Sequence, residues 1–127
     1  MQDQPAPSEV LAAVAAFLRD VVVAETAGHT AFQVRVAANA LEMMRRHLDL
    51  APAAEAAERE RLAALLGHDA PLPDLTAELC RRVAAGEIGL ATPGLADHLW
   101  TTTLDKLAVD QPTYSAYRAT LAERAKT

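Results

Sequence analysis

The chain has 127 residues and a mass of 13.5 kDa, which suits one domain with one hydrophobic core. A hydrophobic share of 51% excludes wholesale disorder, and a single cysteine excludes a disulfide framework. The net charge is -5 and the basic residues are spread along the chain, so the sequence predicts no nucleic-acid partner. Alanine and leucine dominate the hydrophobic residues, and this composition favours an all-α fold.

The N-terminal segments are predicted to form a lead-in and two helices. Residues 1–7 are polar, contain two prolines and are expected to be loose. A first helix is expected to begin at an N-cap serine, Ser8, and to end at a C′ glycine, Gly28. A capping box at Thr30 opens a second helix of about twenty residues, whose apolar arc exceeds half of its circumference. The second helix is therefore predicted to be central, with neighbours on two sides.

Prolines and glycines mark the next two helices. Pro52 stands where a first-turn proline belongs and predicts the start of a third helix, which Gly67 ends. Asp74 is expected to cap a fourth helix after a proline-rich loop, and Gly86 to end it. Each boundary is predicted from local residue types alone.

Two more helices complete the predicted fold. Thr92 and Pro93 read as the N-cap and first position of a fifth helix, and Pro112 separates it from a short sixth. Residues 125–127 are expected to fray. Because the predicted loops are short, the sequence predicts a single domain over 1–127, an antiparallel bundle of about six helices.

The sequence contains no recognisable catalytic or metal-binding motif. The four histidines are far apart, and no pair has the spacing of a helical metal site. Cys80 lies beside apolar residues of its helix and is predicted to be a buried, inert thiol. No phosphate-binding glycine loop and no nucleophile elbow are present. These features favour a non-catalytic domain without metal or cofactor over an enzyme.

A polar stripe runs along the second predicted helix. Arg35, Asn39, Glu42 and Arg46 follow one another at intervals of four, three and four residues. If this helix is central, Arg35 and Asn39 are covered and must be satisfied. Their partner is either a group inside the fold or an anionic ligand or protein from outside, and the sequence leaves both open.

The second unusual segment joins the last two predicted helices. Lys106 can pair with Asp110 one turn later, and Asp110 can also cap the final helix after Pro112. Tyr114 would close this corner by packing. The segment is either a structural corner or a binding site.

Three segments resemble a bacterial family of small helical domains of unknown function: residues 32–41, 52–62 and 102–114. Members of this family are often encoded beside aminoglycoside-phosphotransferase-like kinases and acyl-CoA dehydrogenases. The resemblance implies a link to small-molecule phosphorylation or acyl-CoA metabolism and brings no catalytic residues. The polar positions in the similar segments are Arg35, Asn39, Lys106, Asp110 and Tyr114.

Three functions stay open. The first is a non-catalytic helical accessory domain that binds a second copy of itself, as a homodimer, or a neighbouring enzyme through a helix face. The broad apolar arc and the valine run at 21–23 support it. The second is a small-molecule or acyl-group binding module in which Arg35 and Lys106 receive a phosphate or carboxylate. The third is a structural role, in which the polar residues only set the register of the bundle.

The N-terminus shows no targeting pattern. No basic region precedes the first apolar run, and Arg19 and Asp20 interrupt that run, so neither a signal peptide nor a membrane span is predicted. We expect a cytoplasmic protein with no membrane partner.

Overall fold

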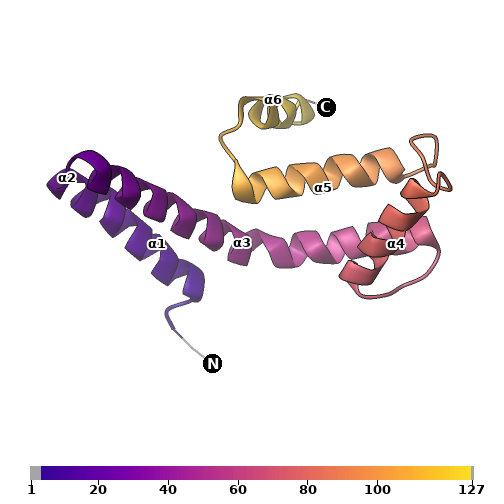
Figure 1. Ribbon diagram of the computed structural model, residues 1–127, viewed down its shortest axis with the longest axis horizontal. Helices are drawn as coiled ribbons and strands as arrows, with labels where there is room; N and C mark the ends of the chain where they lie inside the picture. The colour runs from indigo at the N-terminus through magenta and orange to yellow at the C-terminus, as the bar shows by residue number, and fades with distance from the viewer. Residues whose placement is uncertain (1–3, 127) are drawn as a thin grey trace. The chain divides into compact units, whose positions relative to one another are not determined.

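The computed structural model describes residues 4–126, which form helices and turns without a β-strand (Figure 1). The first helix is continuous through three segments: α1 (Pro7–Phe17), the π-helical turn η1 (Leu18–Val22) and α2 (Val23–Glu25). The others are α3 (Gly28–Leu66), α4 (Leu72–Ala84), α5 (Leu95–Asp110) and α6 (Ser115–Arg124). The all-α prediction is confirmed, but residues 4–126 form five helices where six were expected.

The predicted helix boundary at Pro52 is absent, because Pro52 lies inside α3 and does not start a new helix. A proline cannot donate to the carbonyl four residues before it, here that of Leu48, and such a position costs a helix about 3 kcal/mol. The neighbours on both sides are mostly alanine, leucine and glutamate, which are strong helix formers. Their combined preference keeps one helix of 39 residues.

The first helices begin earlier than predicted. The N-cap of α1 is Ala6 and not Ser8, and the Glu9 carboxylate accepts a hydrogen bond of 2.8 Å from the Ala6 N–H. Gly28, expected to end the first helix, has a φ of +58° and begins α3, ahead of the expected cap at Thr30. Residues 4–6 precede α1, while residues 1–3 of the predicted lead-in lie outside the described part of the chain.

The starts of α4 and α5 also use prolines and glycine in place of side-chain caps. Pro71 is the N-cap of α4, so Asp74 lies within the first turn and does not cap it. Gly94 is the N-cap of α5 with a φ of +87°. The Thr92 hydroxyl accepts a hydrogen bond of 3.1 Å from the Gly89 N–H and so stabilises the preceding turn.

The predicted helix ends are confirmed at two glycines with positive φ. Gly67 follows α3 with a φ of +84°, and Gly86 follows α4 with a φ of +75°. At Gly86 the N–H groups of Gly86 and Glu87 donate to the carbonyls of Val83 and Arg82, which is the Schellman arrangement. At the C-terminus, α6 ends at Arg124 and residues 125–126 form a turn, while residue 127 of the predicted frayed tail lies outside the described residues.

The chain divides into two compact units, Met1–Ala51 (unit 1) and Pro52–Thr127 (unit 2), and the division falls at the proline inside α3. In unit 1 the first helix runs back along the N-terminal half of α3 as a helical hairpin (Figure 1). Its buried residues are Ala15, Ala31 and Ala38. Such small side chains remove little apolar surface from water. The prediction of a single domain over 1–127 stays a prediction.

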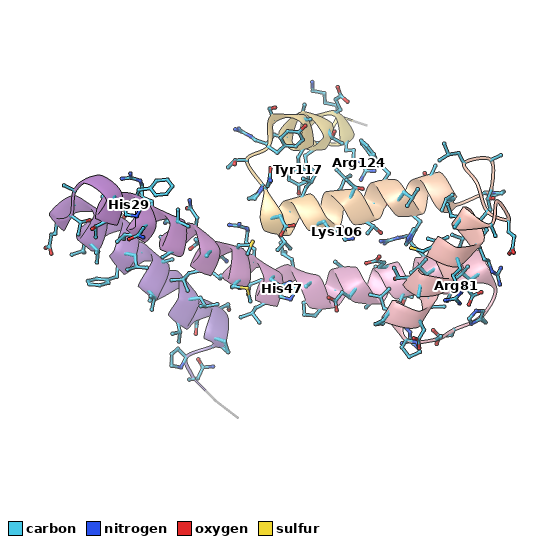
Figure 2. All side chains as sticks on the ribbon, viewed as in Figure 1. His29, His47, Arg81, Lys106, Tyr117 and Arg124 are labelled. Carbon is cyan, nitrogen blue, oxygen red and sulfur yellow. The ribbon has the colours of Figure 1, made fainter. Side chains whose placement is uncertain are left out.

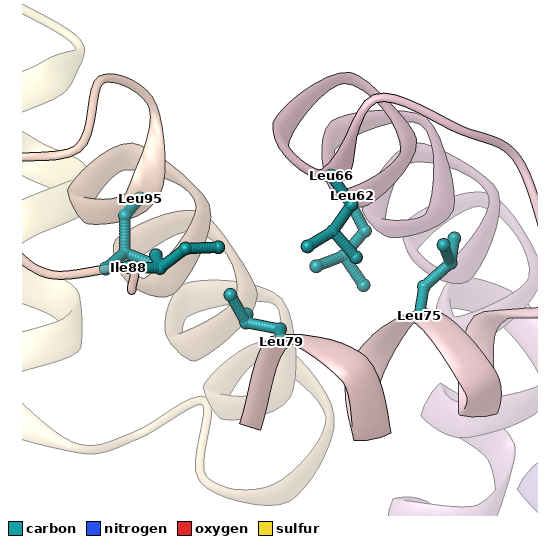
Figure 3. Close-up of a cluster of buried hydrophobic side chains, with 6 residues drawn as sticks. All are labelled: Leu62, Leu66, Leu75, Leu79, Ile88 and Leu95. Carbon is teal, nitrogen blue, oxygen red and sulfur yellow. The ribbon is translucent and has the colours of Figure 1, made fainter. Parts of the chain in front are cut away.

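Unit 2 has a core of larger side chains. Leu62 and Leu66 of α3 meet residues of α4, of the following turn and of the start of α5 (Figure 3): Leu75, Leu79, Ile88 and Leu95. Leu62 and Leu75 are fully buried, and burying a leucine contributes about 1.5–3 kcal/mol. This cluster holds α3, α4 and α5 together.

We expect Leu62→Ala to lower the free energy of unfolding by about 2–5 kcal/mol, because it leaves a cavity in this core. Urea denaturation followed by circular dichroism measures the loss. The matched control is Leu90→Ala, since Leu90 is 80% exposed, and a change within about 0.5 kcal/mol is expected there. Equal effects of the two variants would contradict the assignment of the core.

Replacing the proline inside α3 is expected to stabilise the protein. Pro52→Ala restores an N–H donor in mid-helix and should raise the free energy of unfolding by about 1–3 kcal/mol. The control is Pro112→Ala, because Pro112 lies in the turn between α5 and α6, and no such gain is expected there. A loss of stability in Pro52→Ala would show that α3 depends on the proline.

Candidate functional site

The prediction that Arg35 and Asn39 of α3 are covered is wrong, because both side chains are exposed. Unit 1 supplies one other helix, and the side of α3 that is buried there carries Ala31 and Ala38. Most of the remaining circumference faces outward. Arg35 and Asn39 therefore need no partner inside the fold.

The second predicted cation lies in the other unit. Arg35 belongs to unit 1 and Lys106 to unit 2, and both side chains are exposed. An anion site made by these two residues stays a prediction.

The predicted corner between α5 and α6 is built differently. Within residues 4–126, Asp110 forms no ion pair with Lys106, and the N-cap of α6 is Tyr114. No side chain caps α6, so Asp110 does not have the capping role expected of it. The Tyr114 ring is 49% exposed and closes no core. A binding site made of Lys106, Asp110 and Tyr114 stays a prediction.

Polar side chains do meet between α3 and α5 in unit 2. The Arg61 Nη2 donates to the Thr102 Oγ1 at 3.3 Å and lies 3.5 Å from the Asp105 Oδ2. The Arg61 Nε is buried and has no hydrogen-bond partner in the protein. One end of this guanidinium is thus satisfied and the other is not.

His98 lies on the same face of α5, four residues before Thr102. It is 4% exposed, and its Nδ1 is buried without a hydrogen-bond partner in the protein. Burial lowers the pKa of His98, the charges of Arg61 and Lys106 lower it further, and the charge of Glu58 opposes them. The imidazole is therefore kept neutral in the folded protein.

We call Arg61, His98, Thr102 and Asp105 the polar seam. Sequence reasoning missed it, because Arg61 stands in a charged segment typical of a hydrated helix face. A partial signal was present: His98, Thr102 and Asp105 follow one another at four and three residues on one helix. Their partner is on another helix, and no local pattern indicates it.

Other polar residues form a surface cluster between the loop after α3 and the second half of α4. The Glu78 carboxylate lies 2.9 Å from the His68 Nε2 and 2.6 Å from the Arg82 Nη2. The hydrogen bond from His68 lowers the pKa of Glu78, and Arg82 lowers it further. The cluster ties the loop after α3 to α4.

The described part of the chain holds neither a metal-ligand cluster nor a buried cysteine. No group of three or more histidine, cysteine or acidic side chains is arranged to hold a metal ion within residues 4–126. Figure 2 shows His29 and His47 at separate places along α3. Cys80 is exposed, so the prediction of a buried thiol is wrong.

Unit 1 leaves large apolar side chains uncovered on both of its helices. The stripe on the first helix repeats at four, three and four residues: Val10, Val14, Phe17 and Val21. The stripe on α3 flanks Asn39 and consists of Phe32, Val36, Met43 and Leu50. Phe17 and Phe32 are each 56% exposed. We call these two sets the apolar stripes.

The helices of residues 4–126 include none that combines the length and apolarity needed to span a membrane.

A family model described as "Domain of unknown function (DUF6285)" matches residues 24–114, which include all of α3, α4 and α5. No curated protein and no solved structure matches the chain significantly. The matched segment contains the whole polar seam and the apolar stripe of α3, whereas α1 and α6 lie outside it. The resemblance to a family of unknown function is confirmed, and the neighbouring genes stay a prediction.

The lowered pKa of His98 predicts a pH-dependent stability. As the pH falls below the ordinary value of 6.5, the unfolded chain takes up a proton before the folded chain does, so the free energy of unfolding should decrease. The slope should not exceed about 1.36 kcal/mol per pH unit. Urea denaturation at several pH values above about 5.5 measures it with little contribution from Glu78, whose carboxyl is then largely ionised in the unfolded chain as well.

His98→Phe should remove this part of the pH dependence, since phenylalanine fills the site without titrating. His47→Gln is the control, because His47 is exposed, and it should keep the dependence. An unchanged slope in His98→Phe would contradict the assignment to His98.

Proposed function

The chain belongs to the DUF6285 family of domains of unknown function, and from that premise we propose that it is a non-catalytic helical accessory domain that self-associates through unit 1. One observation carries the proposal. Among the described residues of unit 1, the buried ones are Ala15, Ala31 and Ala38, while eight larger apolar side chains of the apolar stripes are exposed. Surfaces of this kind mark interaction sites in soluble proteins.

Helix geometry supports a second copy as the partner. The intervals of three and four residues in the stripe of the first helix, from α1 into η1, are those of helices that pack along a common axis. Two helical hairpins that pair through such stripes make a four-helix bundle, which is a common way to bury an amphipathic hairpin. A symmetric dimer also uses the same patch twice and needs no second gene product.

The charge of unit 1 is compatible with pairing. Unit 1 contains four arginines and six acidic residues, a net charge of -2, so two copies of this unit repel each other little.

The energetic requirement favours a large interface. Covering the exposed half of a valine or phenylalanine contributes about 1 kcal/mol, and association costs about 4–15 kcal/mol in lost freedom. Covering one stripe contributes a free energy close to the cost of association. Covering two stripes from each of two copies contributes more than that cost.

Asn39 has a defined role in this arrangement. It lies between Val36 and Met43 at the spacing of the stripe on α3, so a partner that covers the stripe also covers its amide. A covered asparagine needs a hydrogen-bond partner from the second copy, and this requirement selects one register. The predicted partner-binding role of Asn39 is thereby retained on an exposed surface.

Light scattering of the purified full chain tests the proposal. The wild-type protein should have the mass of a dimer at micromolar concentration. Val36→Glu and Phe17→Glu should each weaken the dimer at least tenfold, about 1.4 kcal/mol, without loss of helicity, because both side chains are already exposed.

Leu90→Glu is the matched control, since Leu90 is exposed but lies outside unit 1, and it should leave the mass unchanged. A monomeric wild-type protein would overturn self-association. If that monomer formed a defined complex with a neighbouring kinase or acyl-CoA dehydrogenase, the accessory role would stand with a different partner. A dimer unaffected by both stripe variants would place the interface elsewhere.

A further inference from the structure

An open hollow of about 280 Å³ lies in unit 2 between α3 and the start of α5. The α3 side contributes Arg61, Ala64 and Leu65, and the α5 side contributes Pro93, Gly94, Asp97 and His98. All of these residues fall within the segment that matches the family. The hollow does not depend on unit 1 or on self-association.

Two buried polar atoms set this hollow apart. Among the described residues, the buried side-chain nitrogens or oxygens without a hydrogen-bond partner are the Arg61 Nε and the His98 Nδ1. Both residues line the hollow. A buried donor without a partner costs about 1–3 kcal/mol, so folded proteins rarely retain two such groups. A bound molecule that supplies an acceptor would offset this cost.

The start of α5 adds a third feature. Its N-cap is Gly94, which has no side chain to cap the first turn, and no side-chain cap bond is formed there. The N-terminus of a helix carries a partial positive charge that favours anionic groups. The end of this 16-residue helix that lines the hollow is therefore suited to an oxygen acceptor.

The lining defines the chemistry of the ligand. The Arg61 Nε–H is a fixed donor, and His98 can donate from Nδ1 in one of its neutral tautomers. Asp97 lines the hollow and Asp105 lies beside Arg61, so a ligand with two or more negative charges would be repelled. Leu65, Ala64 and Pro93 form an apolar wall.

We propose that the hollow between α3 and α5 binds a small monocarboxylate. Its carboxylate accepts hydrogen bonds from Arg61 and His98, and its short apolar body lies against Leu65 and Pro93. A volume of about 280 Å³ accommodates on the order of ten non-hydrogen atoms, since a water molecule takes about 30 Å³ in the liquid. Both nitrogens are buried, so the side chains that cover them must move aside for the carboxylate to reach them.

Calorimetric titration of the full chain with sodium butyrate tests the proposal, and two-dimensional NMR locates the site. Butyrate should bind saturably and shift the signals of Arg61, His98 and the first turn of α5. Butyramide has the same shape without the charge and should bind at least tenfold more weakly. Inorganic phosphate should not compete with butyrate.

Two variants remove the donors by different routes. Arg61→Met and His98→Phe should each weaken butyrate binding at least tenfold, and His98→Phe keeps an aromatic side chain at a buried position. Arg59→Met is the matched control, because Arg59 pairs with Asp69 on the surface and does not line the hollow. Circular dichroism shows whether each variant remains folded.

The proposal fails if butyrate produces no saturable shift at these residues, or if both donor variants bind it like the wild-type protein. Tighter binding of phosphate than of butyrate would also overturn it. If His98→Phe were only more stable and butyrate binding were unchanged, the unpaired nitrogens would be a structural cost without a ligand. Val36→Glu should bind butyrate normally, which separates this result from that of self-association.

Discussion

Burial of a few branched side chains is the constraint on which this structure depends. Leu62 and Leu66 at the end of α3 are covered by Leu75 and Leu79 of α4, with Ile88 and Leu95 beside them. Where these side chains meet, three helices are held in one cluster, although the ion pairs around them are exposed and weak. Among the described residues of unit 1, those that are buried are alanines, and leucines and valines such as Leu11, Leu18 and Val34 are partly buried. The two halves of α3 thus belong to units with very different means of support.

The sequence was sufficient for the fold class and for the ends of α3 and α4, but less so for the other ends and for the starts. Gly67 and Gly86 adopt positive φ, and no other residue type does so at comparable cost, so these stops are readable locally. Starts were misplaced because several residue types can precede a first turn, and here alanine, proline and glycine do so. The rule that a proline marks the start of a helix fails at Pro52, because the residues on both sides of it are strong helix formers.

Periodicity also showed its limit in α3. The spacing of Phe32, Val36 and Met43 correctly indicates one face of a helix, but it does not show what covers that face. We expected a central helix, and instead the face is exposed, which left Arg35 and Asn39 exposed as well. The polar seam could not be anticipated, because Arg61 and His98 are far apart in sequence and lie near each other only in the folded protein.

The division of the chain at Pro52 matters during synthesis, because the two units leave the ribosome one after the other. A ribosome releases unit 1 first, and the leucine cluster is incomplete until Leu95 has been added. At about 5–20 residues per second, the interval from Ala51 to Leu95 lasts on the order of several seconds. During that time the nascent hairpin displays valines and phenylalanines with no folded neighbour from its own chain. If unit 1 self-associates as proposed, pairing with another copy at this stage would cover these side chains before the rest of the chain is made.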